Sequence, residues 1–268
     1  MNVTGTKNLL TAASNNNVER FIYCSSTEAI GGQSTTFVSE DATPKPNYDY
    51  GESKRQAEEL IKLTAASTGM GYMILRPCGV TGPDDDFAIP ELMSLIDFGL
   101  FFFVPNGAQT HHLMFVHVDD VVQGFVKALE SGDEALGNIY NITPNDSMTY
   151  EDWIKYLCKQ QRRIQPLFSL PMELVKIVVS IAGPIFNIGK RRLFMMKAKT
   201  LARMLEHRSF SNKKATKYLG YKPEYTIKKT IDSTLADLRK REQLWDTPIS
   251  PLAFILGLFV FIGLYFYY

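Results

Sequence analysis

Short apolar segments alternate with amphipathic helical segments over the first half of the chain, and this alternation limits the fold more than any other sequence feature. Strand-like runs lie at Phe21–Cys24, Gly71–Leu75, Met114–Val116 and Asn138–Ile142, and apolar residues at helical spacing lie at Thr4–Asn15, Tyr50–Thr68 and Asp119–Glu130. Strands that alternate with helices of this length are typical of parallel βαβ units with right-handed crossovers. The sequence therefore predicts an α/β protein with a parallel sheet over residues 1–148.

Helical patterns dominate after Thr149, and we expect a mostly helical substrate-binding region over residues 149–248. A strongly apolar stretch inside it, Leu167–Ile188, is either core of that region or a surface that faces lipid and admits a greasy substrate. The second interpretation is favoured because the chain ends in a candidate membrane anchor, and Lys190-Arg191-Arg192 after the stretch suits a phospholipid surface.

The end of the chain, Leu252–Tyr268, is almost wholly apolar and carries no charge. As a helix it would span roughly 26 Å at about 1.5 Å per residue, near the lower limit for crossing a bilayer. A buried core helix is the alternative, but the segment has no polar face to turn outward. We predict a C-terminal transmembrane helix within residues 249–268, with membrane lipid as a partner. Arg239-Lys240-Arg241 just before it predicts a cytosolic body.

Composition narrows the class of partner and the compartment. The net charge is +1, which argues against a nucleic-acid partner because nucleic-acid binders carry a basic excess. The three cysteines, Cys24, Cys78 and Cys158, show no paired spacing, so we expect a reducing compartment and no zinc site. We interpret His111, His112 and His117 as structural or loop residues, since no carboxylate or cysteine shares a ligand spacing with them.

Tyr50 and Lys54 lie four residues apart on a predicted helix, so both side chains project from one face. Two other pairs have this spacing: in Tyr218/Lys222 the lysine precedes Pro223 and so lies in a turn, and Tyr225/Lys229 has no polar strand end nearby in sequence. The strand before Tyr50 runs directly into Ser25-Ser26, and ligands of parallel sheets collect at the carboxyl ends of strands. We therefore expect Ser26, Tyr50 and Lys54 to meet at one site.

These three residue types suit proton transfer from an alcohol. A phenol with a reference pKa of about 10 is too weak a base at neutral pH, and a neighbouring ammonium lowers the pKa of a phenol. Tyr50 would take the proton of a hydroxyl as a hydride leaves its carbon, and Ser26 would donate a hydrogen bond to the same oxygen.

Five motifs occur in the order found in extended short-chain dehydrogenases, the NAD-dependent epimerase/dehydratase superfamily, which the chain resembles. They are Asn2-Val-Thr-Gly-Thr-Lys-Asn-Leu-Leu, Ser25-Ser26, Tyr50-Gly-Glu-Ser-Lys54, Leu75-Arg76-Pro77 before Gly82-Pro83, and His117-Val-Asp-Asp120. The branch that fits best is the group of 3β-hydroxysteroid dehydrogenases and sterol-4α-carboxylate 3-dehydrogenases.

The resemblance implies a function as well as a fold. Ser26, Tyr50 and Lys54 match the family's catalytic triad, the positions of Tyr50 and Lys54 also bind cofactor, and Arg76 and Pro77 line the nicotinamide end. It implies an oxidoreductase that uses NAD or NADP to act on the CH–OH group of a small hydrophobic, steroid-like substrate. It also implies a membrane location at the endoplasmic reticulum and is compatible with a homodimer.

One family feature has no counterpart in the sequence. Members begin with a strand, a G-x-x-G-x-x-G turn and a helix whose amino end holds the pyrophosphate, and no such motif occurs here. We expect a truncated Rossmann-type sheet, from a shortened isoform or an incomplete gene model, that binds NAD at best very weakly.

Two other functions stay open at this point. A nucleotide-sugar epimerase or dehydratase would need basic residues for a diphosphate and would not need the apolar tail. A non-catalytic membrane-bound pseudoenzyme is favoured by the missing glycine motif but opposed by the intact set of Ser26, Tyr50 and Lys54. Among individual residues, we expect Asp119 to cap a helix and Glu28 to be a surface carboxylate.

Overall fold

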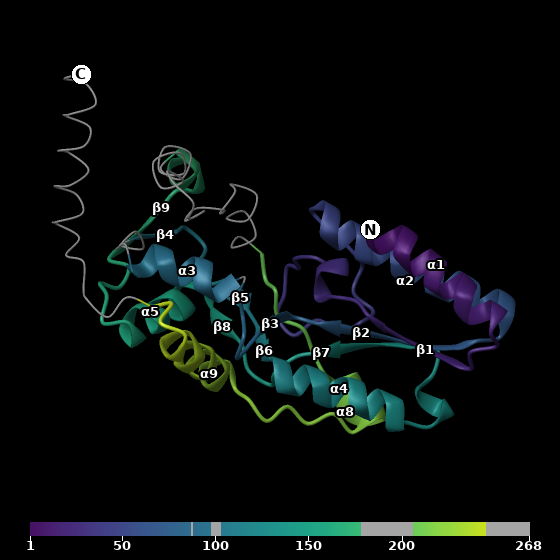
Figure 1. Ribbon diagram of the computed structural model, residues 1–268. Coiled ribbons are helices and arrows are strands. Elements are labelled where there is room, and N and C mark those ends of the chain that lie inside the picture. Colours follow the sequence, from purple (N-terminus) through teal and green to yellow (C-terminus); the bar gives the residue numbers. More distant parts are fainter. Residues whose placement is uncertain (87, 98–102, 178–205, 245–268) are drawn as a thin grey trace, which may run out of the picture. The chain divides into compact units, whose positions relative to one another are not determined.

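The computed structural model describes residues 1–86, 88–97, 103–177 and 206–244, which form two compact units (Figure 1). The first unit comprises Met1–Gly82, His112–Ser147 and Glu206–Thr230, and the second takes the rest of the described residues. One crossing between the units lies between Ser147 and Met148. Residues 83–111 belong to the second unit and residues 206–230 to the first, so neither unit is continuous in sequence.

The first unit contains most of the predicted strands and helices. In chain order they are α1 (Asn2–Asn15), β1 (Arg20–Cys24), η1 (Thr27–Ala29), α2 (Asp49–Thr68), β2 (Gly71–Pro77), β3 (Gly79–Thr81), β5 (His112–Leu113), β6 (Phe115–His117), α4 (Val118–Glu130), η2 (Asp133–Ala135), β7 (Asn138–Ile142) and α8 (Lys213–Leu219). The predicted strands at residues 21–24, 71–75 and 138–142 are confirmed within about two residues, as are the helices that precede and follow them.

A parallel sheet of order β1-β2-β7 forms the centre of this unit. Helices α1 and α2 cover one face of the sheet, and α4 and α8 cover the other (Figure 1). A second pair of parallel strands joins β3 to β6. The predicted α/β class with a parallel sheet is therefore confirmed, and its carboxyl edge is where ligands of such sheets bind.

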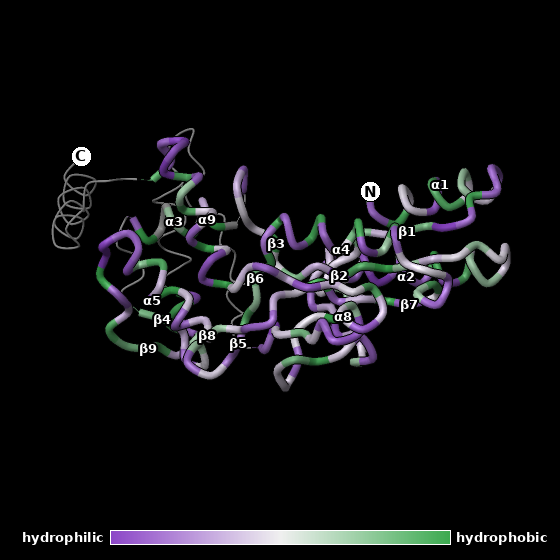
Figure 2. The backbone as a smooth tube through the Cα atoms, turned by 90° about the horizontal axis from the view of Figure 1, so that it is seen from below, coloured by the Kyte–Doolittle hydropathy of each residue, from purple (hydrophilic) through white to green (hydrophobic). Residues whose placement is uncertain are grey.

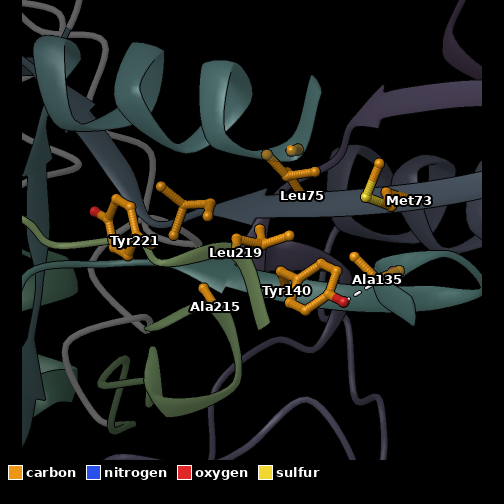
Figure 3. Close-up of a cluster of buried hydrophobic side chains, with 9 residues drawn as sticks. Met73, Leu75, Ala135, Tyr140, Ala215, Leu219 and Tyr221 are labelled. Atoms are coloured by element: carbon orange, nitrogen blue, oxygen red, sulfur yellow. Dashed lines mark hydrogen bonds between the residues drawn. The ribbon is translucent and has the colours of Figure 1, made fainter. Parts of the chain in front are cut away.

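Strand β2 packs against the helices on both faces of the sheet, because its side chains alternate between two hydrophobic clusters. Ile74 packs with Leu10 and Ile61 beneath α1 and α2. Met73 and Leu75 point the other way, into a cluster with Tyr140 and further residues of α4, α8 and their neighbours (Figure 3). The Tyr140 hydroxyl in that cluster donates to the carbonyl of Ala135 at 2.8 Å. Each large apolar side chain buried in this way contributes about 1.5–3 kcal/mol.

The helices of this unit follow the same logic. Hydrophilic and hydrophobic residues alternate along α2 and α4 (Figure 2), as expected for helices with one buried face. Helix α2 ends at Gly69, whose φ of 76° is the left-handed conformation that glycine adopts without a Cβ penalty.

The predicted cap of α4 at Asp119 is wrong. The N-cap is His117, whose Nδ1 accepts the amide of Asp119 at 3.2 Å. Strand β6 ends at His117 and the helix starts at the next residue, so the last extended residue takes the cap position. The N-cap of α8 is Asn212, and the Ser211 hydroxyl before it accepts the amide of Lys213 at 3.3 Å.

The second unit is mainly helical in its described part, with one pair of parallel strands, β4 and β9. Its elements are α3 (Ala88–Asp97), β4 (Phe103–Pro105), β8 (Met148–Thr149), α5 (Tyr150–Gln160), β9 (Phe168–Leu170) and α9 (Ile227–Lys240), the last of which starts in the first unit. A buried ion pair joins Arg163 to Asp97 at 3.1 Å, and the Tyr156 hydroxyl donates to Asp232 at 2.8 Å. These contacts tie α5 and the residues after it to α3 and α9.

No helix among residues 1–86, 88–97, 103–177 and 206–244 is long and apolar enough to cross a membrane. The predicted anchor at Leu252–Tyr268 lies outside the described residues, as does the second part of the Leu167–Ile188 stretch.

Candidate active site

The candidate site begins where β1 ends. The Ser25 amide still donates to the Leu75 carbonyl of β2 at 2.7 Å, so the chain remains attached to the sheet for one residue beyond Cys24. Ser26 follows as the N-cap of η1, and its Oγ accepts the amide of Glu28 at 3.2 Å. The Ser26 side chain is thus buried at the carboxyl end of a parallel strand, the position predicted for it.

Helix α2 brings Tyr50 and Lys54 to this strand end. The Lys54 ammonium donates to the Cys24 carbonyl at 2.8 Å and lies 5.8 Å from the centroid of the Tyr50 ring. It also lies 4.9 Å from the centroid of the Tyr23 ring. The Lys54 ammonium therefore lies close to the backbone just before Ser26 and to the ring of Tyr50, which is one helical turn before Lys54.

Gly51 allows the first turn of α2 to approach η1 closely. A Cβ built on Gly51 would lie 2.4 Å from the Glu28 carbonyl oxygen, closer than any real Cβ contact. The residue next to Gly51 is Tyr50, which is 43% exposed. Its ring also stacks on that of Tyr48, with centroids 6.0 Å apart.

Arg76 and Pro77 end strand β2, and the guanidinium of Arg76 is buried in the protein interior. Its Nε donates to Glu58 Oε1 at 2.8 Å and a terminal nitrogen donates to Glu58 Oε2 at 2.5 Å, with both side chains buried. Another terminal nitrogen donates to the Glu40 carbonyl at 3.4 Å. The predicted contact of Arg76 and Pro77 with the nicotinamide end stays a prediction.

The interpretation of Glu28 as a surface carboxylate is wrong. Its Oε2 forms an ion pair with Arg208 at 2.5 Å, and only 13% of the Glu28 side chain is exposed. Arg208 is also buried and pairs with Glu206 at 3.2 Å. Arg208 lies 180 residues further along the chain, so no local sequence signal indicated the pair.

Glu58 is the second residue that sequence reasoning missed, although a signal was available. It lies four residues after Lys54 and eight after Tyr50, so helical spacing places it on the same face of α2. It is only 1% exposed, and it accepts hydrogen bonds from Arg76 and from the Ser25 hydroxyl, the latter at 2.5 Å.

His111, His112 and His117 each have a hydrogen-bond partner within the described part of the chain. His112 Nδ1 lies 2.9 Å from the Ser147 hydroxyl, His111 Nδ1 lies 2.7 Å from the Gly107 carbonyl, and His117 caps α4. Among the described residues, no group of three or more His, Cys, Asp and Glu side chains is placed to hold a metal ion.

A parallel α/β sheet with polar and aromatic side chains gathered at the carboxyl end of a strand defines the chain as a Rossmann-like α/β protein. The profile of the NAD dependent epimerase/dehydratase family matches residues 1–143. The chain belongs to this family.

Two curated proteins and a solved structure illustrate the relationship. The chain is 27% identical to 3beta-hydroxysteroid-dehydrogenase/decarboxylase isoform 1 of Arabidopsis thaliana, over 87% of this chain and 57% of that protein. It is 29% identical to short-chain dehydrogenase/reductase family 42E member 1 of Homo sapiens, over 84% of this chain and 62% of that protein. The chain thus spans about three fifths of the length of these relatives.

The solved structure is UDP-glucuronic acid 4-epimerase from Bacillus cereus in complex with NAD. It matches 90% of this chain with a TM-score of 0.68 and 22% sequence identity, and the match covers 68% of the epimerase chain. At this identity the likeness establishes a shared fold. Together with the curated relatives, it agrees with the predicted resemblance to extended short-chain dehydrogenases.

Proposed function

We propose that the chain carries the proton-transfer part of an NAD(P)-dependent oxidoreductase that acts on the CH–OH group of a hydrophobic, sterol-like alcohol. Tyr50 is the acid–base, Ser26 binds the reacting oxygen and Lys54 serves both Tyr50 and the cofactor. The observation that carries the proposal is the position of the Lys54 ammonium, between the Cys24 carbonyl and the Tyr50 ring.

The residues present fit the nicotinamide end of the cofactor. An ammonium has three N–H donors, so Lys54 can serve a ribose hydroxyl and the Tyr50 oxygen in addition to the Cys24 carbonyl. Tyr50 is exposed enough to reach a ribose and a substrate. We assign no residue to the pyrophosphate, because the strand, glycine turn and helix that hold it in this fold have no counterpart in the sequence.

When bound, the nicotinamide accepts a hydride from the carbinol carbon or returns one to a carbonyl. In the oxidative direction the Tyr50 oxygen takes the hydroxyl proton as the carbonyl forms, and Ser26 donates a hydrogen bond to that same oxygen. The buried position of Ser26 keeps its hydroxyl fixed while charge develops on the substrate oxygen.

Local charge supports a sterol-like substrate, which carries no diphosphate, over a nucleotide sugar. Glu28 lies two residues after Ser26 and pairs with Arg208. The charge of Arg208 is neutralised by Glu28 and Glu206 together. A diphosphate binds best to cations that carboxylates do not already neutralise. The name of the Arabidopsis relative, a 3beta-hydroxysteroid-dehydrogenase/decarboxylase, supports a sterol-like substrate.

The test is a turnover assay on the full chain in mild detergent, with NAD⁺ or NADP⁺ raised to millimolar concentration because we expect weak cofactor binding. Substrates are a 3β-hydroxysterol and, separately, UDP-glucuronic acid. Tyr50→Phe should lower kcat on the sterol by about 10²–10⁴-fold, the usual contribution of a general acid–base. The matched control is Tyr218→Phe, which alters an exposed tyrosine of another Tyr-x-x-x-Lys pair in the same unit and should leave kcat unchanged.

Three results would overturn the proposal. Sterol turnover that survives Tyr50→Phe would remove Tyr50 from the chemistry. Turnover of UDP-glucuronic acid but not of sterol would favour the epimerase or dehydratase alternative. Absence of turnover with every substrate and both cofactors would favour a non-catalytic protein.

A further inference from the structure

Glu58 is a buried carboxylate on the same face of α2 as Tyr50 and Lys54. The residues lie at successive intervals of four, so their side chains follow one another along the helix. Carboxylates are almost never fully buried unless they are paired. The partners of Glu58 therefore indicate what its burial accomplishes.

Those partners lie at the ends of two neighbouring strands. Glu58 accepts two hydrogen bonds from Arg76 on β2, which fix the orientation of the carboxylate. The Oε1 atom also accepts the Ser25 hydroxyl at 2.5 Å, and Ser25 is the residue immediately before Ser26. Arg76 thus orients the carboxylate, and the carboxylate in turn holds Ser25.

Helix α2 contacts the segment around Ser26 at three places. Lys54 binds the Cys24 carbonyl, Glu58 binds the Ser25 side chain, and Gly51 lies against the Glu28 carbonyl. These contacts fall on both sides of Ser26 in sequence. The relative position of Ser26 and the first turn of α2 therefore depends on all three.

We propose that Glu58 is a positioning residue, which through Ser25 holds Ser26 in the place that Tyr50 and Lys54 require. This inference deepens the proposed function and rests on it. Glu58 itself touches no reacting atom in this scheme. A 1 Å displacement of a catalytic group can lower a rate by about a hundredfold, so a link of this kind has a measurable effect on catalysis.

The test removes the link and keeps the buried ion pair. Ser25→Ala deletes the hydroxyl that donates to Glu58, while the Glu58–Arg76 pair stays intact. Glu58→Gln is the second variant and removes the charge from the acceptor. The control is Glu59→Gln on the same helix. The Glu59 side chain is 51% exposed and pairs with Lys62 at the surface.

The first readout is hydrogen exchange of the full chain, which needs no cofactor and no turnover. Amides of residues 25–30 are held by bonds such as Ser25 to Leu75 and Ala29 to Ser26. In Ser25→Ala they should exchange about tenfold faster, because a hydrogen bond to a charged group is lost. The amides of β7, in the same unit, should keep their rates, and Glu59→Gln should change neither segment.

The second readout is turnover of the sterol, where Ser25→Ala should lower kcat between about tenfold and a hundredfold with little change in KM. Unchanged exchange of residues 25–30 would overturn the inference, and so would an equal acceleration in β7, which would mean general loss of stability. Faster local exchange with an unchanged kcat would break the link to catalysis. If the parent chain turns over no alcohol, the proposed function fails, and the exchange experiment still decides whether Glu58 holds Ser25.

Discussion

The buried pair between Arg76 and Glu58 gives a stability prediction that depends only on the first unit. In Arg76→Met the methionine fills much of the space of the arginine stem but provides no hydrogen-bond donors. The Glu58 carboxylate then keeps the Ser25 hydroxyl as a partner but loses the two hydrogen bonds and the charge of the guanidinium.

The size of the effect follows from burial. The two side chains are 3% and 2% exposed, so water cannot replace the lost partner. Removing one member of a buried pair costs about 3–5 kcal/mol, against a typical stability of about 5–15 kcal/mol. Arg76→Met with Glu58→Met should recover most of this loss. A deficit of about 1–2 kcal/mol should remain because the buried Ser25 hydroxyl then lacks its acceptor.

Lys62→Met provides the surface comparison. Lys62 pairs with Glu59 at 2.9 Å on the same helix, but the two side chains are 37% and 51% exposed. Such pairs contribute less than about 1 kcal/mol.

The free energy of unfolding of the first unit can be measured by pulse labelling of Cys78, which is buried in that unit. The assay uses urea on a Cys24→Ser background, because Cys24 is exposed and would react in the folded state. The reasoning is refuted if Arg76→Met costs no more than Lys62→Met, or if the double variant is as unstable as Arg76→Met alone.

Two further predictions concern a buried acid and the tail. Glu40 accepts the Asn141 amide at 2.7 Å, and burial raises the pKa of its carboxyl despite the opposing charges of Lys214 and Arg76. Its stabilising contribution is therefore full below the unfolded pKa of about 4.3 and is lost as pH rises through the folded value. The free energy of unfolding of Glu40→Gln minus that of the parent should grow from pH 4 upward and then level off, and a difference that is flat or falls with pH contradicts this. Removal of Leu252–Tyr268 should release the tagged chain from the membrane fraction, and a deletion variant that stays equally membrane-bound would refute this anchor.

Much of the first unit was predictable because its signals are local. Strand β7 was predicted with its observed bounds, and the end of α2 at Gly69 follows from the freedom of glycine at positive φ. The short strands were harder to predict. Residues 114–116 were expected to form a strand, which corresponds to β6. Its partner β3 was not predicted, because a strand of three residues is too short to show an alternating pattern.

The triad positions came from spacing and from the rule that ligands meet the carboxyl ends of parallel strands. The sequence did not indicate which charged residues would form ion pairs with one another. Glu28 and Arg208 are brought together by the return of residues 206–230 to the first unit, and that return has no signature in the intervening sequence. Glu58 had a signature in its spacing, but its burial depends on Arg76 on a different element.

The three contacts that place α2 against the segment around Ser26 differ in what they require of the sequence. Lys54 and Gly51 both meet backbone carbonyls, at Cys24 and Glu28, so neither contact depends on the side chain at those two positions. The requirement falls on α2 itself, which needs a long cation at one position and the absence of a Cβ at the other. Only the contact from Glu58 is made to a side chain, that of Ser25. Because a backbone carbonyl is present whatever residue supplies it, the position of Ser26 relative to Tyr50 is set mainly by residues of α2. In the segment around Ser26, Ser25 is the residue whose side chain matters for this position.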